Sequence, residues 1–346
     1  MNDTTSAPAP APTAGPGKPA PLTSTVPTTR GALAGTLANV GGLLVALILM
    51  CVLFGSLSQY FFTAETFVTI ANDIPAIAVT AVGMTFVLII AGIDLSVGSV
   101  MAISAATAGI AMLQWHWPLV PATIVAMVTG LVAGTINGSI SVAFRLPSFI
   151  VTLGMLEVAR GAAYLATGSR TQYIGGPIEW LSAPKLFGLS PAFAIAIVII
   201  VVAQVVLTRT VFGRCMIGIG TNEEAMRLAG VDPRPIKIAV FALAGLLAGL
   251  GGVFQASRLE AADPNAGIGA ELVVIASVVI GGTSLMGGRG SVINTLFGVL
   301  VISVLEAGLA QIGASEPTKR IITGCVIIVA VVLDMLRERR AKRSAA

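Results

Sequence analysis

The sequence predicts an all-α polytopic membrane protein with about ten transmembrane helices. Hydrophobic residues make up 55% of the 346 residues and charged residues only 10%, which are too few to cover a soluble protein of this size. The apolar runs are long and continuous, whereas the strands of a membrane β-barrel would alternate in polarity. Glycine is abundant, with 39 residues, as expected for helices that pack closely in lipid.

The two ends of the chain differ in composition from the long middle part. Residues 1–30 are rich in Pro, Ala and Thr and cannot bury enough apolar surface to become ordered, so we expect a disordered cytoplasmic tail. Residues 38–336 form the predicted transmembrane domain, which contains a cytoplasmic loop at 208–237. Residues 337–346 form a short basic cytoplasmic tail.

Ten apolar windows follow one another, and most are near the 20 or so residues that a helix needs to cross a bilayer. They cover residues 38–58, 74–92, 95–113, 119–144, 148–167, 191–207, 238–255, 270–283, 291–311 and 321–336. The run from Ile74 to Leu113 is too long for one crossing, which predicts a short or broken helix near 83–98. The short eighth window predicts another near 270–290.

Basic residues predict the orientation in the membrane. If the windows cross alternately from an inner N-terminus, fourteen of the 20 lysines and arginines fall inside, five fall outside, and Arg160 lies within a span. This bias follows the positive-inside rule and places both termini in the cytoplasm. The net charge of +4 is too small and scattered to suggest a nucleic-acid partner. The three cysteines and one histidine have no ligand spacing, so no metal site is expected.

Glycines recur at every fourth position in the fourth window. Gly130, Gly134 and Gly138 give one helix a smooth stripe that allows another backbone to approach closely. We expect this stripe to pack within one subunit and not between subunits.

The loop at 208–237 contains a predicted short helix over residues 222–229. Thr221 and Glu224 have the spacing of a capping box, and Gly230 suits the stop after the last turn. Glu223 and Arg227 are spaced as an i,i+4 ion pair. Ala225 and Leu228 lie on another side of this helix, which could dock into a groove on a partner or simply join two spans. The residues alone leave both readings open.

Several motifs, taken in order, resemble one family. They are Val82-Gly-Met-Thr85, Gly92-Ile-Asp-Leu-Ser-Val-Gly-Ser99, Gly213-Arg214, Asn222-Glu-Glu-Ala225, Arg227-Leu-x-Gly230, Gly245-Leu-Leu-Ala-Gly249, Ile280-Gly-Gly-Thr-Ser-Leu285 and Gly287-Gly-x-Gly290. Over residues 61 to 334 the chain is similar to the ribose-type sugar permeases of bacterial ABC importers. The resemblance implies a multi-pass subunit of the bacterial inner membrane, surrounded by lipid bilayer, that imports a monosaccharide or cyclic polyol such as ribose, xylose or inositol by alternating access.

The resemblance also implies partners. These are a second permease copy or a paralogue, a cytoplasmic ABC ATPase subunit and a periplasmic sugar-binding protein. The coupling helix that meets the ATPase would comprise Thr221, Asn222, Glu223, Glu224, Ala225, Arg227, Leu228 and Gly230.

The chain is not expected to be an enzyme. A P-loop requires a lysine, and the nearest run, from Gly282 to Arg289, has Gly288 at that position. We therefore expect no catalytic residue and no cofactor in this chain, with ATP and Mg bound by the partner ATPase.

Polar residues within the spans are candidates for the substrate path. We name Asp94, Ser96, Thr85, Asn137 and Asn294, although such side chains more often form hydrogen bonds between helices than contact a ligand. For Asp94, a cap on the third span with the help of Ser96 is the favoured reading. Glu157 and Arg160 lie three residues apart in one span and are predicted to form a structural charge pair.

Two other classes of function compete with an ABC importer. An ion-gradient-driven secondary transporter would need no coupling helix and would usually show a clearer relay of ionisable groups. A membrane scaffold or sensor would not transport at all. Co-purification with an ATPase subunit separates the importer from both.

Overall fold

The computed structural model describes the backbone of residues 29–185 and 187–344, and the side chains of residues 41–185, 187–329 and 332. The predicted tail at 1–30 lies outside the described residues apart from its last two, and the predicted tail at 337–346 lies within the last helix up to Ser344. The chain divides into the units Met1–Ala38 and Asn39–Ala346. Only the first turns of helix α1 are described in the first unit, and the account below concerns the second.

The described residues form helices and one pair of very short strands. In chain order the elements are α1 Thr29–Leu57, α2 Ala64–Ile89, α3 Val97–Leu113, α4 Leu119–Ala143, α5 Ser148–Thr167, β1 Gln172–Tyr173, α6 Gly176–Glu179, α7 Pro191–Arg209, α8 Val211–Thr221, α9 Glu223–Leu228, α10 Pro233–Leu259, β2 Ala261–Ala262, α11 Ala270–Ile280, α12 Val292–Gln311 and α13 Glu316–Ser344. Each predicted apolar window coincides with a helix. Within the described residues, six helices are long and apolar enough to cross a membrane, namely α2, α4, α5, α7, α10 and α12.

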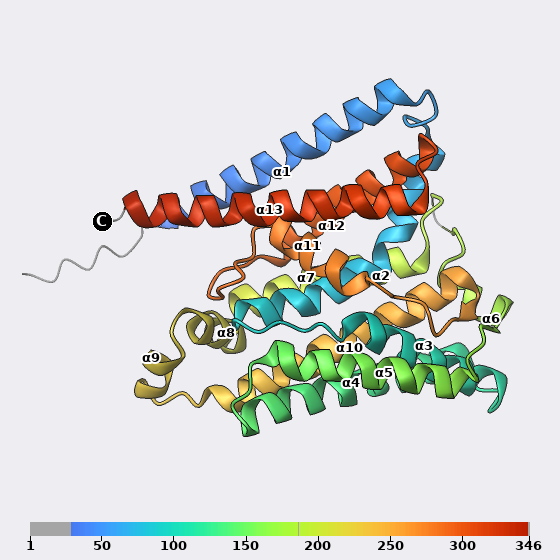
Figure 1. Cartoon of the computed structure of the whole chain (residues 1–346), viewed down its shortest axis with the longest axis horizontal. Helices are drawn as coiled ribbons and strands as arrows, with labels where there is room; N and C mark the ends of the chain where they lie inside the picture. The colour runs from blue at the N-terminus through green and yellow to red at the C-terminus, as the bar shows by residue number, and fades with distance from the viewer. Residues whose placement is uncertain (1–28, 186, 345–346) are drawn as a thin grey trace, which may run out of the picture. The chain divides into compact units, whose positions relative to one another are not determined.

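The order of elements repeats itself in the two halves of the second unit. In α2–α3–α4–α5 and again in α10–α11–α12–α13, a long helix is followed by an irregular segment, a short helix and two long helices. Helices α2 and α10 pack against each other in opposite directions, because α2 ends at the same end of the molecule where α10 begins (Figure 1). The two halves are therefore related as an inverted repeat, an arrangement common in transporters.

The predicted break near 83–98 is present, and the predicted short helix near 270–290 is α11, which a second interruption precedes. Residues 90–96 separate α2 from the 17-residue helix α3, and residues 260–269 separate α10 from the 11-residue helix α11, apart from the two residues of β2. The starts of the two short helices meet, since a Cβ on Gly98 would collide with the Gly267 carbonyl and one on Gly267 with the Gly98 carbonyl. Gly267 also has a φ of +75°, which favours glycine.

Helix α5 satisfies backbone groups of both broken segments. The amides of Ile93 and Leu95 donate to the hydroxyls of Ser148 and Thr152, at 2.9 and 3.1 Å. A few turns further along, the Arg160 guanidinium donates to two carbonyls of the second segment. Irregular backbone inside a membrane domain needs such partners, because lipid offers no hydrogen bonds.

The glycine stripe on α4 packs against α10 within the chain, as predicted. A Cβ on Gly130 would meet the Gly245 carbonyl, and one on Gly134 would meet the Phe241 carbonyl. Because both backbones are in contact along the stripe, α4 and α10 form the most extensive helix–helix contact among the described elements.

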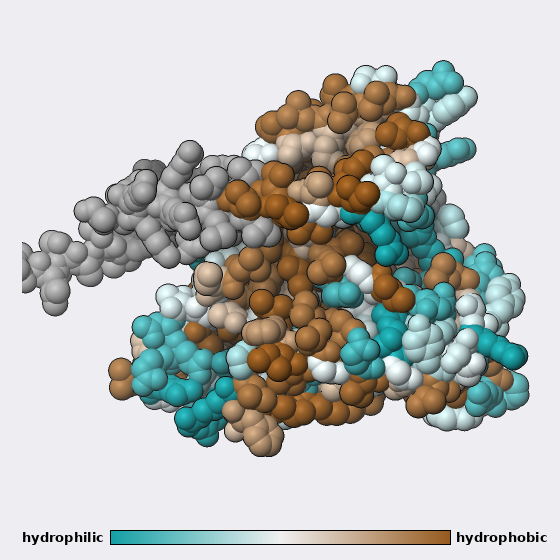
Figure 2. All heavy atoms as spheres, in the orientation of Figure 1, coloured by the Kyte–Doolittle hydropathy of each residue, from teal (hydrophilic) through white to brown (hydrophobic). Residues whose placement is uncertain are grey.

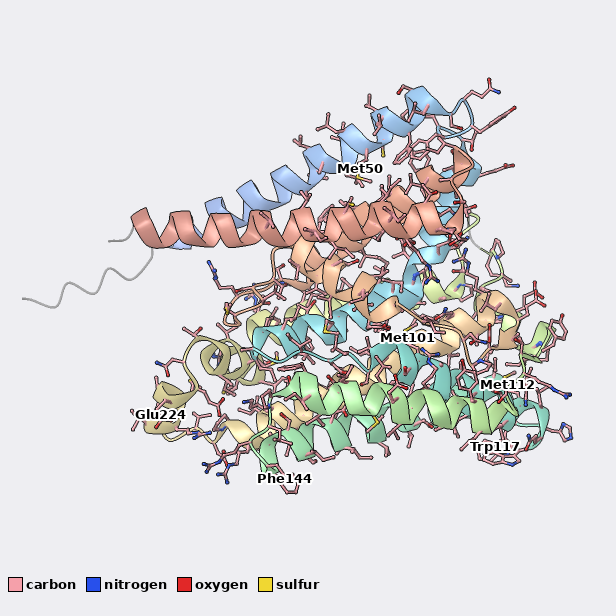
Figure 3. The ribbon with its side chains drawn as sticks, viewed as in Figure 1. Met50, Met101, Met112, Trp117, Phe144 and Glu224 are labelled. Carbon is pink, nitrogen blue, oxygen red and sulfur yellow. The ribbon has the colours of Figure 1, made fainter. Side chains whose placement is uncertain are left out.

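The second unit has two polar ends with an apolar middle, as Figure 2 shows for one face. The α9 end comprises α8, α9, the end of α2, the α4–α5 turn and the α11–α12 segment. The α6 end comprises α6, the β1–β2 pair, and the α3–α4 and α12–α13 turns. Figure 3 shows Glu224 and Phe144 at the first end and Trp117 at the second.

The α4–α10 contact gives a matched test of packing. Gly134→Ala is expected to destabilise the protein by about 1–3 kcal/mol, because the added methyl group must displace backbone. Gly42→Ala, also helical but with no atom within 4 Å of the new Cβ, should leave the stability unchanged or slightly increased. Thermal unfolding of both purified variants in detergent checks this, and equal stability of the two would contradict the assigned packing.

Candidate functional site

The short helix predicted in the cytoplasmic loop is present as α9, but the predicted capping box is wrong. Thr221 is the last residue of α8, where its hydroxyl donates to the Ile217 carbonyl at 2.8 Å. Asn222 is the N-cap instead, with extended backbone (φ −160°) and a side-chain oxygen 2.9 Å from the Ala225 amide. The predicted stop at Gly230 is confirmed, since this residue has a φ of +83°.

Three charged side chains fix α9 on the start of α10. Glu223 accepts a hydrogen bond from Arg227 at 2.7 Å, as predicted. It also accepts one from Lys237 of α10 at 2.8 Å, a contact that the spacing within α9 does not predict. Partial burial by itself raises the pKa of Glu223, but the hydrogen bonds and positive charges of Lys237 and Arg227 lower it further, so the net pKa is below its ordinary value. Arg227 also lies 3.8 Å from Glu224, which extends the cluster outward.

The outward side of α9 is uncovered in the described chain. Leu228 is 83% exposed, and Glu224, Ala225 and Ala229 are exposed beside it. Met226 faces the opposite way and packs over Gly218 of α8. The helix therefore presents a small surface of mixed apolar and acidic character to a partner.

A basic cleft of about 370 Å³ lies beside α9. The α4–α5 turn forms one wall, with Arg145, and the start of α10 forms the other, with Arg234 and Lys237. Glu223 and Arg227 close it on the α9 side. The cleft joins α9 to two long helices that are distant in sequence.

Helix α8 lies within the predicted loop at 208–237 and joins α9 to the core. Its buried residues Gly213, Met216 and Ile219 recur every third position, an amphipathic signal that was present in the sequence. Gly220 packs directly on the backbone of Ile89 at the end of α2.

The α11–α12 segment completes this junction. Its Gly288 amide donates to the Ile89 carbonyl at 2.8 Å, and a Cβ on Gly288 would touch Thr221. The end of α8, to which α9 is joined, is thus in direct contact with the end of α2 and with the α11–α12 segment.

The residues predicted for the substrate path lie inside the protomer. Asp94 is 2% exposed and accepts from the Ser96 amide and hydroxyl at 2.8 and 2.6 Å, and Asn137 donates to the Ser96 hydroxyl at 3.0 Å. Thr85 bonds Thr295 of α12 at 2.8 Å. Asn294, also of α12, is 6% exposed. Thus Thr85 and Asn137 each bond a residue of another element and Asp94 bonds locally, while the buried side-chain oxygens of Asn137 and Asn294 have no hydrogen-bond partner among the described residues.

The predicted Glu157–Arg160 charge pair is not among the ion pairs of the described residues. Arg160 is directed at the Pro264 and Ala266 carbonyls, while Glu157 is exposed on α5. These two carbonyls need hydrogen-bond donors inside the membrane domain, and the guanidinium bonds them in place of Glu157. The sequence could not reveal this contact, because the two carbonyls lie over 100 residues from Arg160.

Metal binding finds no support in the described part of the chain, where no group of three or more His, Cys, Asp or Glu side chains could hold an ion.

Known proteins give a consistent match. Residues 66–331 match the family model for the permease component of branched-chain amino acid transport systems. The ribose import permease protein RbsC of Escherichia coli K12 is 35% identical, over 84% of this chain and 92% of its own length. The fructose import permease protein FrcC of Rhizobium meliloti is 32% identical over 84% of each chain, and the autoinducer 2 import system permease protein LsrC of Yersinia pseudotuberculosis is 32% identical over 85% and 84%.

No solved structure matches the chain. The family match covers more than half of the sequence, and the helices that it spans include those long and apolar enough for a membrane. The chain therefore belongs to this family of transport permease components, as a multi-pass permease subunit of an ABC importer in the bacterial inner membrane.

Proposed function

We propose that this subunit imports a monosaccharide or cyclic polyol into the cytoplasm by alternating access, driven by a separate ABC ATPase. The proposal of ATPase coupling rests on helix α9, which is exposed. Glu223 of α9 forms an ion pair with α10, and α8 joins α9 to the end of α2. The substrate class follows from the names of the relatives, which specify ribose, fructose and autoinducer 2.

We place the α9 end in the cytoplasm. Its described basic residues outnumber its acidic ones: Arg145, Arg209, Arg214, Arg227, Arg234, Lys237 and Arg289 against Glu223, Glu224 and Asp232. The α6 end lacks this excess, with Arg170, Lys185, Arg258, Lys319 and Arg320 against Glu65, Asp73, Glu179, Glu260, Asp263 and Glu316. The difference favours the positive-inside orientation, with ten crossings and both termini cytoplasmic.

Helix α9 is the proposed coupling helix. Leu228, Ala225 and Glu224 would enter a groove on the ATPase, and Glu223 and Arg227 would hold the helix rigid on α10. The ATPase would bind ATP and Mg, while this chain binds neither. Closure of two ATPase subunits would then move two copies of α9, in a permease dimer formed with a second copy or a paralogue.

Movement of α9 would be transmitted to the membrane helices through direct contacts. Gly220 abuts Ile89, the Gly288 amide bonds the same residue, and Lys237 bonds Glu223. A push on α9 therefore acts on α2 and α10, the two helices that pair at the centre of the inverted repeat. Rocking of these helices would open the path alternately to the two sides, and a periplasmic sugar-binding protein would deliver substrate at the α6 end.

Replacing Glu223, Glu224 and Arg227 together by Ala is expected to lower ATP-driven uptake about tenfold, because the docking helix loses its anchor and its charges. ATPase activity should persist without being coupled to uptake. Glu65→Ala, which removes an exposed carboxylate at the α6 end, should leave uptake unchanged. Normal uptake by the correctly assembled triple variant would exclude α9 as the coupling helix.

Lowering the pH should weaken the ion pair by which Glu223 holds α9 on α10. Because the folded-state pKa of Glu223 is lowered, its stabilising contribution is complete above the ordinary carboxylate pKa of about 4.3 and is lost as pH falls through the lower folded value. Glu223→Gln should remove this component, so parent and variant differ most near neutral pH and converge in acid. Thermal unfolding across pH measures the difference, and a constant gap between them would contradict the prediction.

Uptake into proteoliposomes identifies the substrate. The chain, its cognate ATPase and its binding protein are expected to import at least one of ribose, xylose, fructose and inositol when ATP is supplied. Leucine and valine belong in the panel because the family description names branched-chain amino acids. Uptake of an amino acid alone would refute the sugar assignment, and uptake driven by an ion gradient without ATP would refute ABC coupling.

A further inference from the structure

A cavity of about 460 Å³ opens toward the α6 end between α13 and the helices beneath it. Its lining includes Gln255 of α10, the start of α11, Glu306 of α12, and Glu316, Lys319 and Arg320 of α13. Figure 2 shows hydrophilic residues gathered in the hollow below α13. The volume lies in the range of about 300–1,000 Å³ that is typical of small-molecule sites.

The charges of this lining balance. Glu316 and Lys319 form an ion pair at 2.6 Å, and Arg320 supplies a positive charge for the remaining carboxylate, that of Glu306. A cavity with no net charge favours a neutral ligand over a phosphorylated or cationic one.

Glu306 is the group most available to a ligand. It is exposed into the cavity, although it lies within the apolar helix α12, and it makes no ion pair among the described residues. A carboxylate in a membrane helix is costly and marks a functional position by default. Its two oxygens can accept from two neighbouring hydroxyl groups.

Further lining residues suit a polyhydroxylated ring. Gln255 offers both a donor and an acceptor. Ile77, Ile268 and Leu272 form an apolar surface for the carbon-bound hydrogens of the ring. This mixture of a few polar groups and apolar walls is common in small-molecule sites.

Two other cavities share lining residues in a series from this cavity to α6. Gln255 and Ile77 also line a smaller cavity of about 100 Å³, and there Asp73 and Arg258 form an ion pair at 2.7 Å. That pair also lines a third cavity of about 310 Å³ beside α6. The smallest cavity thus shares walls with both of the others.

We infer that the 460 Å³ cavity binds a neutral polyhydroxylated compound on its way through the permease, with Glu306 and Gln255 as the hydroxyl-binding groups. This inference rests on the proposed function, whose sugar substrate class it adopts. It assigns part of the substrate recognition to the permease itself, at groups other than the buried residues Asp94, Ser96 and Asn137.

Protection of an engineered thiol tests the inference in the assembled transporter. Ile268, which is 52% exposed and lines the cavity, is changed to Cys in a chain whose three native cysteines are replaced by Ser. Ribose and inositol, each at millimolar concentration and without binding protein, are the probes. One of them should slow modification of the Ile268→Cys variant by a membrane-impermeant thiol reagent, but not of a Tyr60→Cys control, which is exposed at the same end outside the cavity.

The second part of the thiol-protection experiment replaces the carboxylate of Glu306. Glu306→Gln should raise the sugar concentration needed for half-protection about tenfold, since it removes charge-assisted hydrogen bonds, and Gln255→Leu should act in the same direction. Glu65→Gln is the matched control and should have no effect. Thermal unfolding of the Glu306→Gln permease and its co-purification with the ATPase are measured beside the half-protection, which separates loss of binding from loss of fold or assembly.

The outcomes separate the two proposals. ATP-driven uptake of ribose or inositol without thiol protection by that sugar, or with protection unchanged in Glu306→Gln, would overturn the cavity assignment and leave the importer function intact. Absence of sugar uptake in the parent complex, with an amino acid imported instead, would remove the proposed function and this inference with it.

Discussion

Two interruptions of helices inside an apolar domain impose the strongest constraint on this structure. The segments before α3 and α11 carry amides and carbonyls that lipid cannot satisfy, so other elements must supply the partners. Helix α5 does this for both, through Ser148 and Thr152 on one segment and Arg160 on the other. The packing of α5 against both segments follows from that requirement, and so does the position of Arg160.

The close contact of α4 with α10 is a second constraint on the packing of the helices. Glycine at Gly130, Gly134 and Gly245 lets the two backbones touch, which fixes α10 beside α2. Helix α10 then links the two ends of the molecule. Lys237 at its start bonds the proposed coupling helix, and Gln255 and Arg258 near its end line the cavities at the α6 end. A rigid helix of this length can transmit the movement of α9 to the region where substrate is proposed to bind.

Local sequence patterns predicted the positions of the helices, including α9, but not the contacts of the polar residues within the spans. The ten windows and the break near 83–98 follow from local hydropathy and length, which lipid converts directly into structure. The cap of α9 was misassigned because Thr221 and Asn222 are both good caps, and the choice depends on where α8 ends. The path residues were chosen for polarity alone, and polarity within a span does not distinguish a group that faces a cavity from one that bonds a neighbouring helix.

By itself the sequence determined the class of protein, the apolar helices, the resemblance to sugar permeases and the short charged helix within the loop at 208–237, because each depends on residues close together in the chain. Tertiary structure alone decided that Arg160 serves carbonyls of a distant segment and not Glu157, and that Lys237 joins the Glu223–Arg227 pair. It also brought Gln255, Glu306 and Lys319 to one cavity. These side chains come from α10, α12 and α13, and only the packing of helices remote in sequence determines which polar groups face each other across a shared space.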